Sequence, residues 1–195
     1  MLSHERLWRN VPNAISIARL CAAPVLLASV VGHRVGIFKW LLLACLLSDI
    51  LDGLIARTFR LASKLGASLD STADILTMLI GTLGLVVFQR PFVSAHWREL
   101  LLVVVLYLAE VAASLWRYGK VSSFHTLLAR VAAYAAGVFV ISLLFLGYHG
   151  WLFYIAMSVY VVELSEEMVL IYLLAEWRSD VGGMVRVLAG RKANS

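Results

Sequence analysis

Six segments of the chain are each long enough and apolar enough to cross a membrane as a helix. They cover residues 14–31, 37–58, 65–89, 98–118, 126–147 and 151–177. A helix that spans a bilayer needs about 20 mostly apolar residues. Of all residues, 62% are hydrophobic and 15% are charged, whereas soluble domains have roughly 45–50% and about 25%. The sequence therefore predicts an all-α, polytopic membrane protein with six transmembrane helices.

The connections between these segments are short, so consecutive helices are expected to pack antiparallel. The length of 195 residues suits one domain, and the sequence contains no internal repeat. We therefore expect a single membrane domain over residues 1–195. Residues 1–13 are predicted to form a juxtamembrane segment, and residues 178–195 a basic tail.

Lysine and arginine residues indicate the orientation of the chain. Eleven of them fall at the ends of segments on one side, against four on the other. Loops rich in these residues stay in the cytoplasm, so both termini are predicted to be cytoplasmic. The protein itself is predicted to lie in the cell membrane. The net charge of +5 does not indicate a nucleic-acid partner, because the basic residues lie at the ends of apolar segments.

Four of the five aspartates lie within one 26-residue window of this apolar sequence: Asp49, Asp52, Asp70 and Asp74. A charge inside the hydrocarbon costs roughly 2.5–3.5 kcal/mol on insertion scales, so such groups are usually functional. Four neighbouring carboxylates repel one another unless a strong positive charge lies between them. Hard divalent cations such as Mg²⁺ prefer oxygen ligands, so the window predicts a metal site at the cytoplasmic side.

The spacing of the aspartates predicts how they meet. Asp49 and Asp52 are three residues apart, and Asp70 and Asp74 are four apart, so each pair shares one helix face. The two pairs are nearly symmetric about position 61, and a tight turn there would bring Asp52 to Asp70 and Asp49 to Asp74. The less favoured alternative is that Arg57, Arg60 or Lys64 pair with these acids and merely hold two helices together. Three cations would neutralise four acids only in part.

Small residues and an arginine accompany the acids. Gly53 and Ala56 lie on or beside the Asp49 and Asp52 face, and Gly66 lies on the Asp70 side. Small side chains let a bulky ligand approach the backbone, and the guanidinium of Arg57 can bind a phosphate through two hydrogen bonds. Together with the acids, these residues indicate a site for a phosphate ester.

This pattern resembles the signature of the CDP-alcohol phosphotransferase family. The matching positions read Asp49-x2-Asp52-Gly53-x2-Ala56-Arg57-x8-Gly66-x3-Asp70-x3-Asp74, and residues 11–20 are similar to the segment that opens many members. The resemblance implies transfer of a phosphoalcohol group from a CDP-linked donor to an acceptor hydroxyl, with release of CMP. For this chain it favours phosphatidyl transfer from CDP-diacylglycerol in phospholipid biosynthesis.

The resemblance also implies roles for particular residues. Two Mg²⁺ or Mn²⁺ ions would bind Asp49, Asp52, Asp70 and Asp74, with Asp74 as general base. The positions that match the CDP pocket are Gly53, Ala56, Arg57 and Gly66. Family members are expected to form homodimers.

The acceptor is left open by the sequence. Members that use glycerol-3-phosphate or make cardiolipin commonly read Asp-Pro-x-Ala-Asp-Lys, whereas this chain has Ser71 after Asp70 and Ile75 after Asp74. These differences weaken glycerol-3-phosphate as acceptor, and serine, inositol phosphate or another small polar alcohol remain candidates. Arg117, Lys120 and Arg130 could bind an acceptor phosphate or simply anchor the helices at the membrane surface.

Other functions are also compatible with this sequence. A divalent-cation transporter also carries intramembrane carboxylates, a related enzyme could use a CDP-amino alcohol with a lipid acceptor, and an inactive scaffold could retain the fold.

Four further acids lie in apolar segments: Glu110, Glu163, Glu166 and Glu167. We expect them to pair internally with Arg130 or Arg19, rather than to bind acceptor hydroxyls, because unpaired acids in a membrane are costly.

Overall fold

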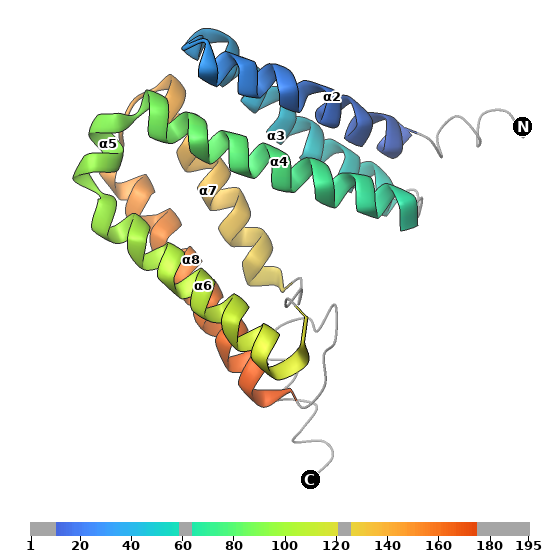
Figure 1. Ribbon diagram of the computed structural model, residues 1–195, viewed down its shortest axis with the longest axis vertical. Helices are drawn as coiled ribbons and strands as arrows, with labels where there is room; N and C mark the ends of the chain where they lie inside the picture. Colours follow the sequence, from blue (N-terminus) through green and yellow to red (C-terminus); the bar gives the residue numbers. More distant parts are fainter. Residues whose placement is uncertain (1–10, 59–63, 121–125, 175–195) are drawn as a thin grey trace, which may run out of the picture. The chain divides into compact units, whose positions relative to one another are not determined.

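The computed structural model describes residues 11–58, 64–120 and 126–174, and for residues 11–12, 53–58, 64–65 and 67 it describes the backbone alone. These ranges contain seven helices and no strand (Figure 1). The helices are α2 (Val11–Val31), α3 (Val35–Thr58), α4 (Lys64–Phe88), α5 (Arg90–Ala95), α6 (Trp97–Tyr118), α7 (Leu127–Phe145) and α8 (Gly150–Leu173).

The six long helices agree with the six predicted segments to within a few residues. One helix was not predicted. Helix α5 has six residues and lies where the sequence predicted only a break between helices, at Arg90 and Pro91. A proline is tolerated there because it lies in the first turn, where its missing N–H has no partner within the helix. The predicted end of the last segment, at residue 177, lies outside the described residues.

Four helical stretches are long and apolar enough to span a membrane: Asn13–Val31, Ser68–Phe88, Trp97–Tyr118 and Leu127–Phe145. Helices α3 and α8 have 24 residues each, but every 18-residue window in them holds three charged residues. The charges that lower their apolar character include Asp49 and Asp52 in α3 and Glu163 in α8. The four apolar helices fit a membrane protein, while six spans and the orientation of the termini stay predictions.

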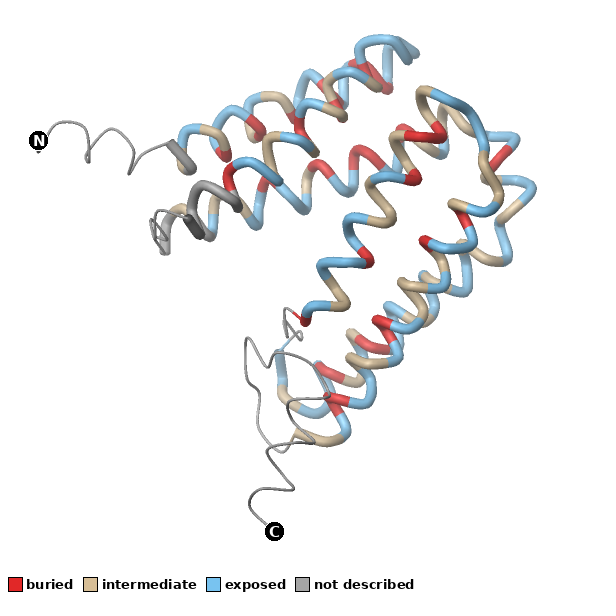
Figure 2. The backbone as a smooth tube through the Cα atoms, turned by 180° about the vertical axis from the view of Figure 1, so that it is seen from behind, coloured by how far each residue is buried: buried red, intermediate tan, exposed pale blue. Residues whose placement is uncertain are grey.

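Large apolar side chains face outward along the long helices. Exposed positions recur along each of them in Figure 2, and many hold residues such as Trp40, Leu79, Leu108, Val138 and Tyr172. Soluble monomers rarely expose continuous apolar surface of this kind, which marks a membrane or an interaction surface. The outer surface is therefore suited to lipid.

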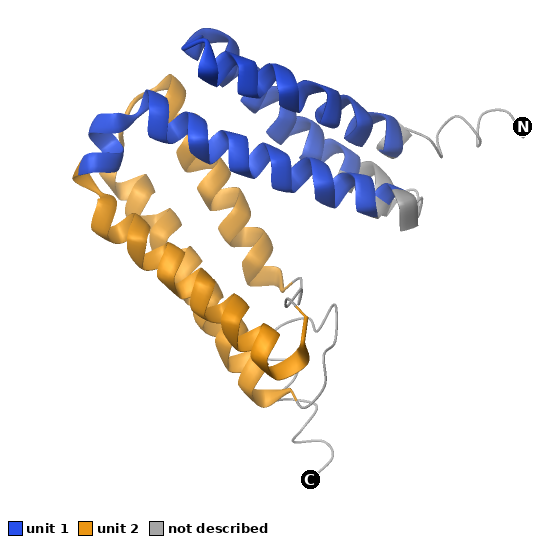
Figure 3. Cartoon of the chain, in the orientation of Figure 1, with its two compact units in different colours: residues 1–94 blue, residues 95–195 orange. Residues whose placement is uncertain are grey.

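The helices group into two compact units, residues 1–94 and 95–195 (Figure 3). In the first unit α2 packs along both α3 and α4, which contact one another less extensively. In the second unit α6 and α7 each pack against α8. Helix α6 is tied to the end of α8 by Tyr118, whose hydroxyl lies 2.9 Å from the carbonyl oxygens of Ile171 and Leu174.

Helices α3 and α4 pair in an antiparallel register centred near residue 61. Gly84 lies against the ring of Phe38, and a Cβ atom there would be 2.1 Å from Cζ of that ring. Further along, a Cβ atom on Gly81 would lie 3.4 Å from Leu42. Each of these pairs is nearly equidistant from residue 61, as are the two aspartate pairs. The glycines therefore allow the close approach that fixes the register of the aspartates.

We predict that Gly84→Ala destabilises the protein although alanine favours a helix. The added methyl group overlaps the fully buried ring of Phe38, and overpacking of this kind costs about 1–3 kcal/mol. The matched control is Gly36→Ala in α3, where a Cβ atom meets nothing within 4 Å. Thermal unfolding in detergent should show a lower melting temperature for the first variant and an unchanged or higher one for the control. Equal melting temperatures would contradict the packing argument.

Candidate active site

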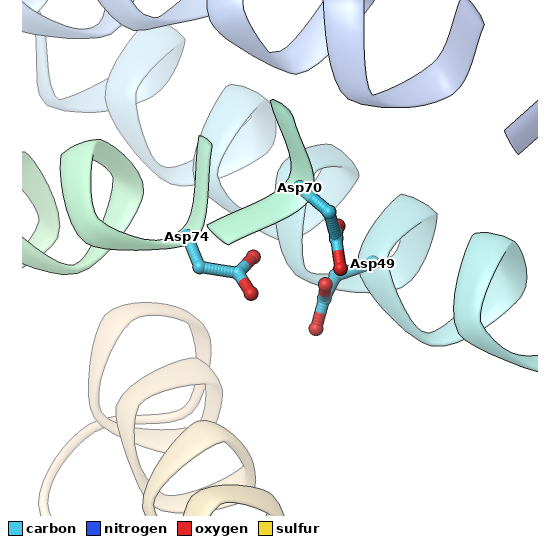
Figure 4. A group of neighbouring side chains, drawn as sticks. All are labelled: Asp49, Asp70 and Asp74. Atoms are coloured by element: carbon cyan, nitrogen blue, oxygen red, sulfur yellow. The ribbon is translucent and has the colours of Figure 1, made fainter. Parts of the chain in front are cut away.

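The four aspartates come from two helices and face one another. Asp49 and Asp52 lie on α3, and Asp70 and Asp74 lie on α4. Figure 4 shows the carboxyl groups of Asp49, Asp70 and Asp74 directed toward a common region between these helices. One carboxylate oxygen of each of these three lies within 4.8 Å of the others. The predicted convergence of acids on one site is therefore present in the structure.

A third helix contributes the cation at the centre of the site. The side chain of Arg19, on α2, is only 3% exposed and forms ion pairs with all four aspartates. Its Nη1 atom lies 2.7 Å from Asp49 and 2.7 Å from Asp74. Its Nη2 atom lies 3.1 Å from Asp52 and also bonds Asp70. Each terminal nitrogen thus bridges one of the two pairs that the spacing predicted.

Burial differs between the four acids. Asp52 is 4% exposed and lies 3.5 Å from the hydroxyl of Ser16, which can donate a hydrogen bond to it. The side chains of Asp49, Asp70 and Asp74 are 42%, 40% and 48% exposed. Three carboxylates are therefore open to a ligand, while Asp52 contributes its charge from a buried position.

The site fits a hard divalent cation. Its donors are carboxylate oxygens, which Mg²⁺ and Mn²⁺ prefer, and they already surround one positive group, the guanidinium of Arg19. In an octahedral Mg²⁺ site the ligands lie about 3.0 Å apart when adjacent and about 4.2 Å apart when opposite. The three exposed carboxylates, whose oxygens lie within 4.8 Å of one another, would therefore draw together on binding one ion. A divalent ion could be held by Asp49, Asp70 and Asp74, with Asp52 beside them.

Sequence reasoning missed the role of Arg19. The prediction that the glutamates pair with Arg130 or Arg19 is wrong for Arg19, because its guanidinium bonds the aspartates instead. Pairing with Arg130 stays a prediction. The available signal was charge balance, since one arginine and four acids all lie in apolar segments where each charge needs a partner. Ser16 and Arg19 are also three residues apart, so they share a helix face.

The structure describes the side-chain environment of only some of the other predicted site residues. Gly66 is half-buried in α4. Gly53, Ala56 and Arg57 belong to α3, but their side chains lie outside the described residues, as do Arg60 and the side chain of Lys64. The predicted CDP pocket therefore stays a prediction, and so does the alternative in which Arg57, Arg60 or Lys64 pairs with the acids.

The three candidate acceptor residues lie in the second unit. Arg117 donates from Nε and Nη2 to the carbonyl oxygen of Leu174, at 3.2 Å each. Lys120 follows the end of α6, and its carbonyl oxygen accepts a hydrogen bond from Ser114 at 2.8 Å. Arg130 is exposed on α7. Binding of an acceptor phosphate by these residues stays a prediction.

The glutamates of the second unit gather between α6 and α8. Glu110 and Glu163 are buried, and Glu163 lies close enough to Glu110 and Glu166 for their charges to interact. Tyr160 lies beside Glu163 and Glu167. This grouping brings acid next to acid, in place of the pairing with Arg19 that the sequence predicted.

Comparison with known proteins identifies the family. The model of the CDP-alcohol phosphatidyltransferase family matches residues 9–162, which include Arg19 and all four aspartates. The chain belongs to this family. The match bears out the predicted resemblance and favours a membrane-bound transferase of phospholipid synthesis over a cation transporter.

Three curated relatives are similar to parts of the chain. A CDP-diacylglycerol–glycerol-3-phosphate 3-phosphatidyltransferase from Rickettsia felis is 28% identical over 136 residues, covering 61% of this chain and 71% of the relative. A cardiolipin synthase (CMP-forming) from Streptomyces coelicolor is 36% identical over 98 residues, or 47% of this chain and 41% of the relative. A CDP-diacylglycerol–glycerol-3-phosphate 3-phosphatidyltransferase from Aquifex aeolicus is 32% identical over 81 residues, or 42% and 46%. The chain thus spans less than half of the last two relatives. No solved structure matches it.

We predict that Asp49→Asn weakens binding of Mn²⁺ by at least about tenfold, because the site loses a charged oxygen ligand. Electron paramagnetic resonance of free Mn²⁺ during titration of the purified protein measures the affinity. Glu99→Gln is the control, since it removes a negative charge from an exposed position on α6. If both variants bind Mn²⁺ as the unchanged protein does, the aspartates do not form the metal site.

Proposed function

We propose that the protein transfers a phosphatidyl group from CDP-diacylglycerol to the hydroxyl group of a small glycerol-based acceptor and releases CMP. The observation that carries this proposal is the convergence of four aspartates on one cation within apolar helices. Their spacing matches the family signature, and the family match runs through both compact units. This also supports treating residues 1–195 as a single functional domain.

The proposed reaction exchanges one phosphate ester for another. The acceptor oxygen attacks the phosphorus that carries the diacylglycerol, a new P–O bond forms, and the P–O bond to CMP breaks. CMP leaves with the electron pair of that bond, and the acceptor hydroxyl loses its proton. Such transfers depend mostly on positioning and on neutralising negative charge, which fits a site made of charged groups held on rigid helices.

Asp74 is proposed to accept the proton from the acceptor. Its side chain is 48% exposed, so a substrate hydroxyl can reach it, and a carboxylate within hydrogen-bond reach can act as general base. Asp52 is excluded as the general base because its side chain is only 4% exposed. Asp49 and Asp70 are exposed to a similar extent as Asp74, so exposure does not decide among these three. The choice among these three follows from the family motif.

All four aspartates, Asp74 included, are proposed to hold the divalent ions. Mg²⁺ or Mn²⁺, when bound, would stabilise negative charge on the pyrophosphate and on the departing CMP. With Arg19 beside them, the four carboxylates carry a formal net charge of three negative. Two divalent ions would leave the site slightly positive and able to receive an anionic pyrophosphate, which supports a two-ion site. Gly53, Ala56, Arg57 and Gly66 flank the aspartates in sequence on the side of the loop between α3 and α4, where they are proposed to bind CDP.

The acceptor proposed first is glycerol-3-phosphate. Two of the relatives are named for this acceptor and the third for cardiolipin synthesis, which outweighs the differences at Ser71 and Ile75. Arg117, Lys120 and Arg130 are proposed to bind the acceptor phosphate. Serine and inositol phosphate have less support, because none of these relatives is named for them.

The proposed setting is the cell membrane, with the site and both termini facing the cytoplasm. The support is the excess of lysine and arginine at the aspartate side of the apolar segments. The exposed apolar surface would let the acyl chains of the donor remain in the bilayer while its CDP group reaches the aspartates. A homodimer is proposed from the family alone.

We predict that the purified protein with Mg²⁺ or Mn²⁺ releases CMP from CDP-diacylglycerol when glycerol-3-phosphate is supplied, and releases less with serine or inositol phosphate. Asp74→Asn should lower kcat by about 10²- to 10⁴-fold, as expected for loss of a general base, whereas Glu99→Gln should retain activity. Chromatography of CMP and of the lipid product measures the reaction.

The same preparation distinguishes the competing functions. Folded, metal-loaded protein that releases no CMP with any acceptor would refute the enzyme hypothesis. Movement of Mn²⁺ into liposomes without CMP release would favour a transporter. CMP release from a CDP-amino alcohol and a lipid acceptor, but not from CDP-diacylglycerol, would assign the other branch of the family.

A further inference from the structure

Arg19 has a place in the site that the proposed reaction does not explain. It lies on a different helix from the aspartates, its side chain is 3% exposed, and it is ion-paired with four acids at once. A lone arginine in an apolar helix is costly, and so is a set of uncompensated acids. Each group therefore reduces the cost of the other.

The shape of the guanidinium matters as much as its charge. Its two terminal nitrogens each bond two carboxylates, one from α3 and one from α4. A lysine has a single charged nitrogen and could not reproduce this planar, forked arrangement. Arg19 thus joins α2, α3 and α4 through one side chain.

The charges nevertheless do not balance. Four ionised carboxylates against one guanidinium leave a formal charge of three negative at the site. One divalent ion would leave it slightly negative, and two would make it positive and able to receive an anionic pyrophosphate. The arrangement in the structure is therefore suited to taking up further cations.

The contacts of Arg19 are also incomplete. Its Nε atom is buried and has no hydrogen-bond partner among the described residues. A buried donor left without an acceptor is unfavourable, so the guanidinium is not in a fully satisfied position. Three of the carboxylates that it bonds are 40–48% exposed and can be reached by ions.

We propose that Arg19 is the resident counter-cation of the aspartate site. It holds the four carboxylates together before divalent ions bind, and it competes with these ions for the same oxygen atoms. Arg19 is thus a positioning residue that sets both the stability of the metal-free protein and its affinity for metal. This inference rests on the proposed metal-dependent function.

The competition has a consequence that a purely structural arginine would not have. Because a metal ion must take carboxylate oxygens that bond Arg19, the guanidinium and the metal ion weaken each other's interactions, and coupling between two interactions typically amounts to about 5- to 150-fold. Removing Arg19 should therefore strengthen metal binding while it destabilises the metal-free protein. A structural salt bridge alone would give the loss of stability without the gain in affinity.

The test compares Arg19→Gln with Arg34→Gln, which makes the same chemical change at an exposed position between α2 and α3. Both are purified in Mn²⁺, and the metal is then removed with a chelator. Arg19→Gln is expected to lower the melting temperature of the metal-free protein by about 5 °C or more. It is also expected to bind Mn²⁺ about 5- to 150-fold more tightly in a paramagnetic resonance titration. Arg34→Gln should change neither quantity, and Arg19→Lys should lie between the two.

A second variant keeps the test decisive if Arg19→Gln does not fold without metal. The double variant Arg19→Gln/Asp52→Asn removes one of the four repelling charges at a buried position. It should recover part of the stability that Arg19→Gln loses, so the two changes are expected to be less than additive. The Mn²⁺ affinity of the double variant is then compared with that of Asp52→Asn alone.

The inference is overturned if removing Arg19 leaves Mn²⁺ affinity unchanged or weakens it, in the single or the double variant. It is also overturned if metal-free stability is the same for Arg19→Gln and Arg34→Gln. The proposed function is tested separately by CMP release from the unchanged protein. If the unchanged protein releases CMP but Arg19→Gln has unaltered affinity for Mn²⁺, only the role of Arg19 is refuted. If the unchanged protein releases no CMP but Arg19→Gln shows the expected change in affinity, only the reaction is refuted.

Discussion

The attraction between one buried guanidinium and four carboxylates organises the first half of this protein. Arg19 draws its partners from α3 and α4, and it lies on α2, the helix that packs along both of them. In an apolar environment charges interact strongly and an unpaired charge is expensive. The position of α2 and the geometry of the acids therefore depend on each other.

The same register serves both packing and chemistry. Glycines on α4 let it approach the side chains of Phe38 and Leu42 on α3, and this antiparallel alignment continues to the aspartates near the other end of the helices. A shift by one residue would turn each acid about 100° around its helix, and the two pairs would separate. The apolar contacts far from the site thus determine which carboxylates share a cation.

Much of this arrangement could be predicted from the sequence because it follows from local patterns. Six apolar segments gave six long helices, and intervals of three and four residues placed each pair of aspartates on one helix face. The contribution of Arg19 could not be derived in that way, because it depends on the packing of a helix 30 or more residues away in the chain. The short helix α5 was missed because Pro91 in a short connection indicates a break, although the first turn of a helix is the position where a proline costs least.

Differences in burial give the four aspartates different roles within the site. Asp52 is enclosed with Ser16 behind the guanidinium, so its carboxylate supplies fixed negative charge and cannot meet a substrate. The three exposed carboxylates face a region that ions and phosphates can enter. An enzyme that transfers a lipid-bearing phosphate from a nucleotide donor needs both properties, because it must keep charge inside apolar protein and also present charge to its substrates at the protein surface. Arg19 satisfies the first requirement by neutralising the buried acid, and the excess of negative charge over this one cation provides the second.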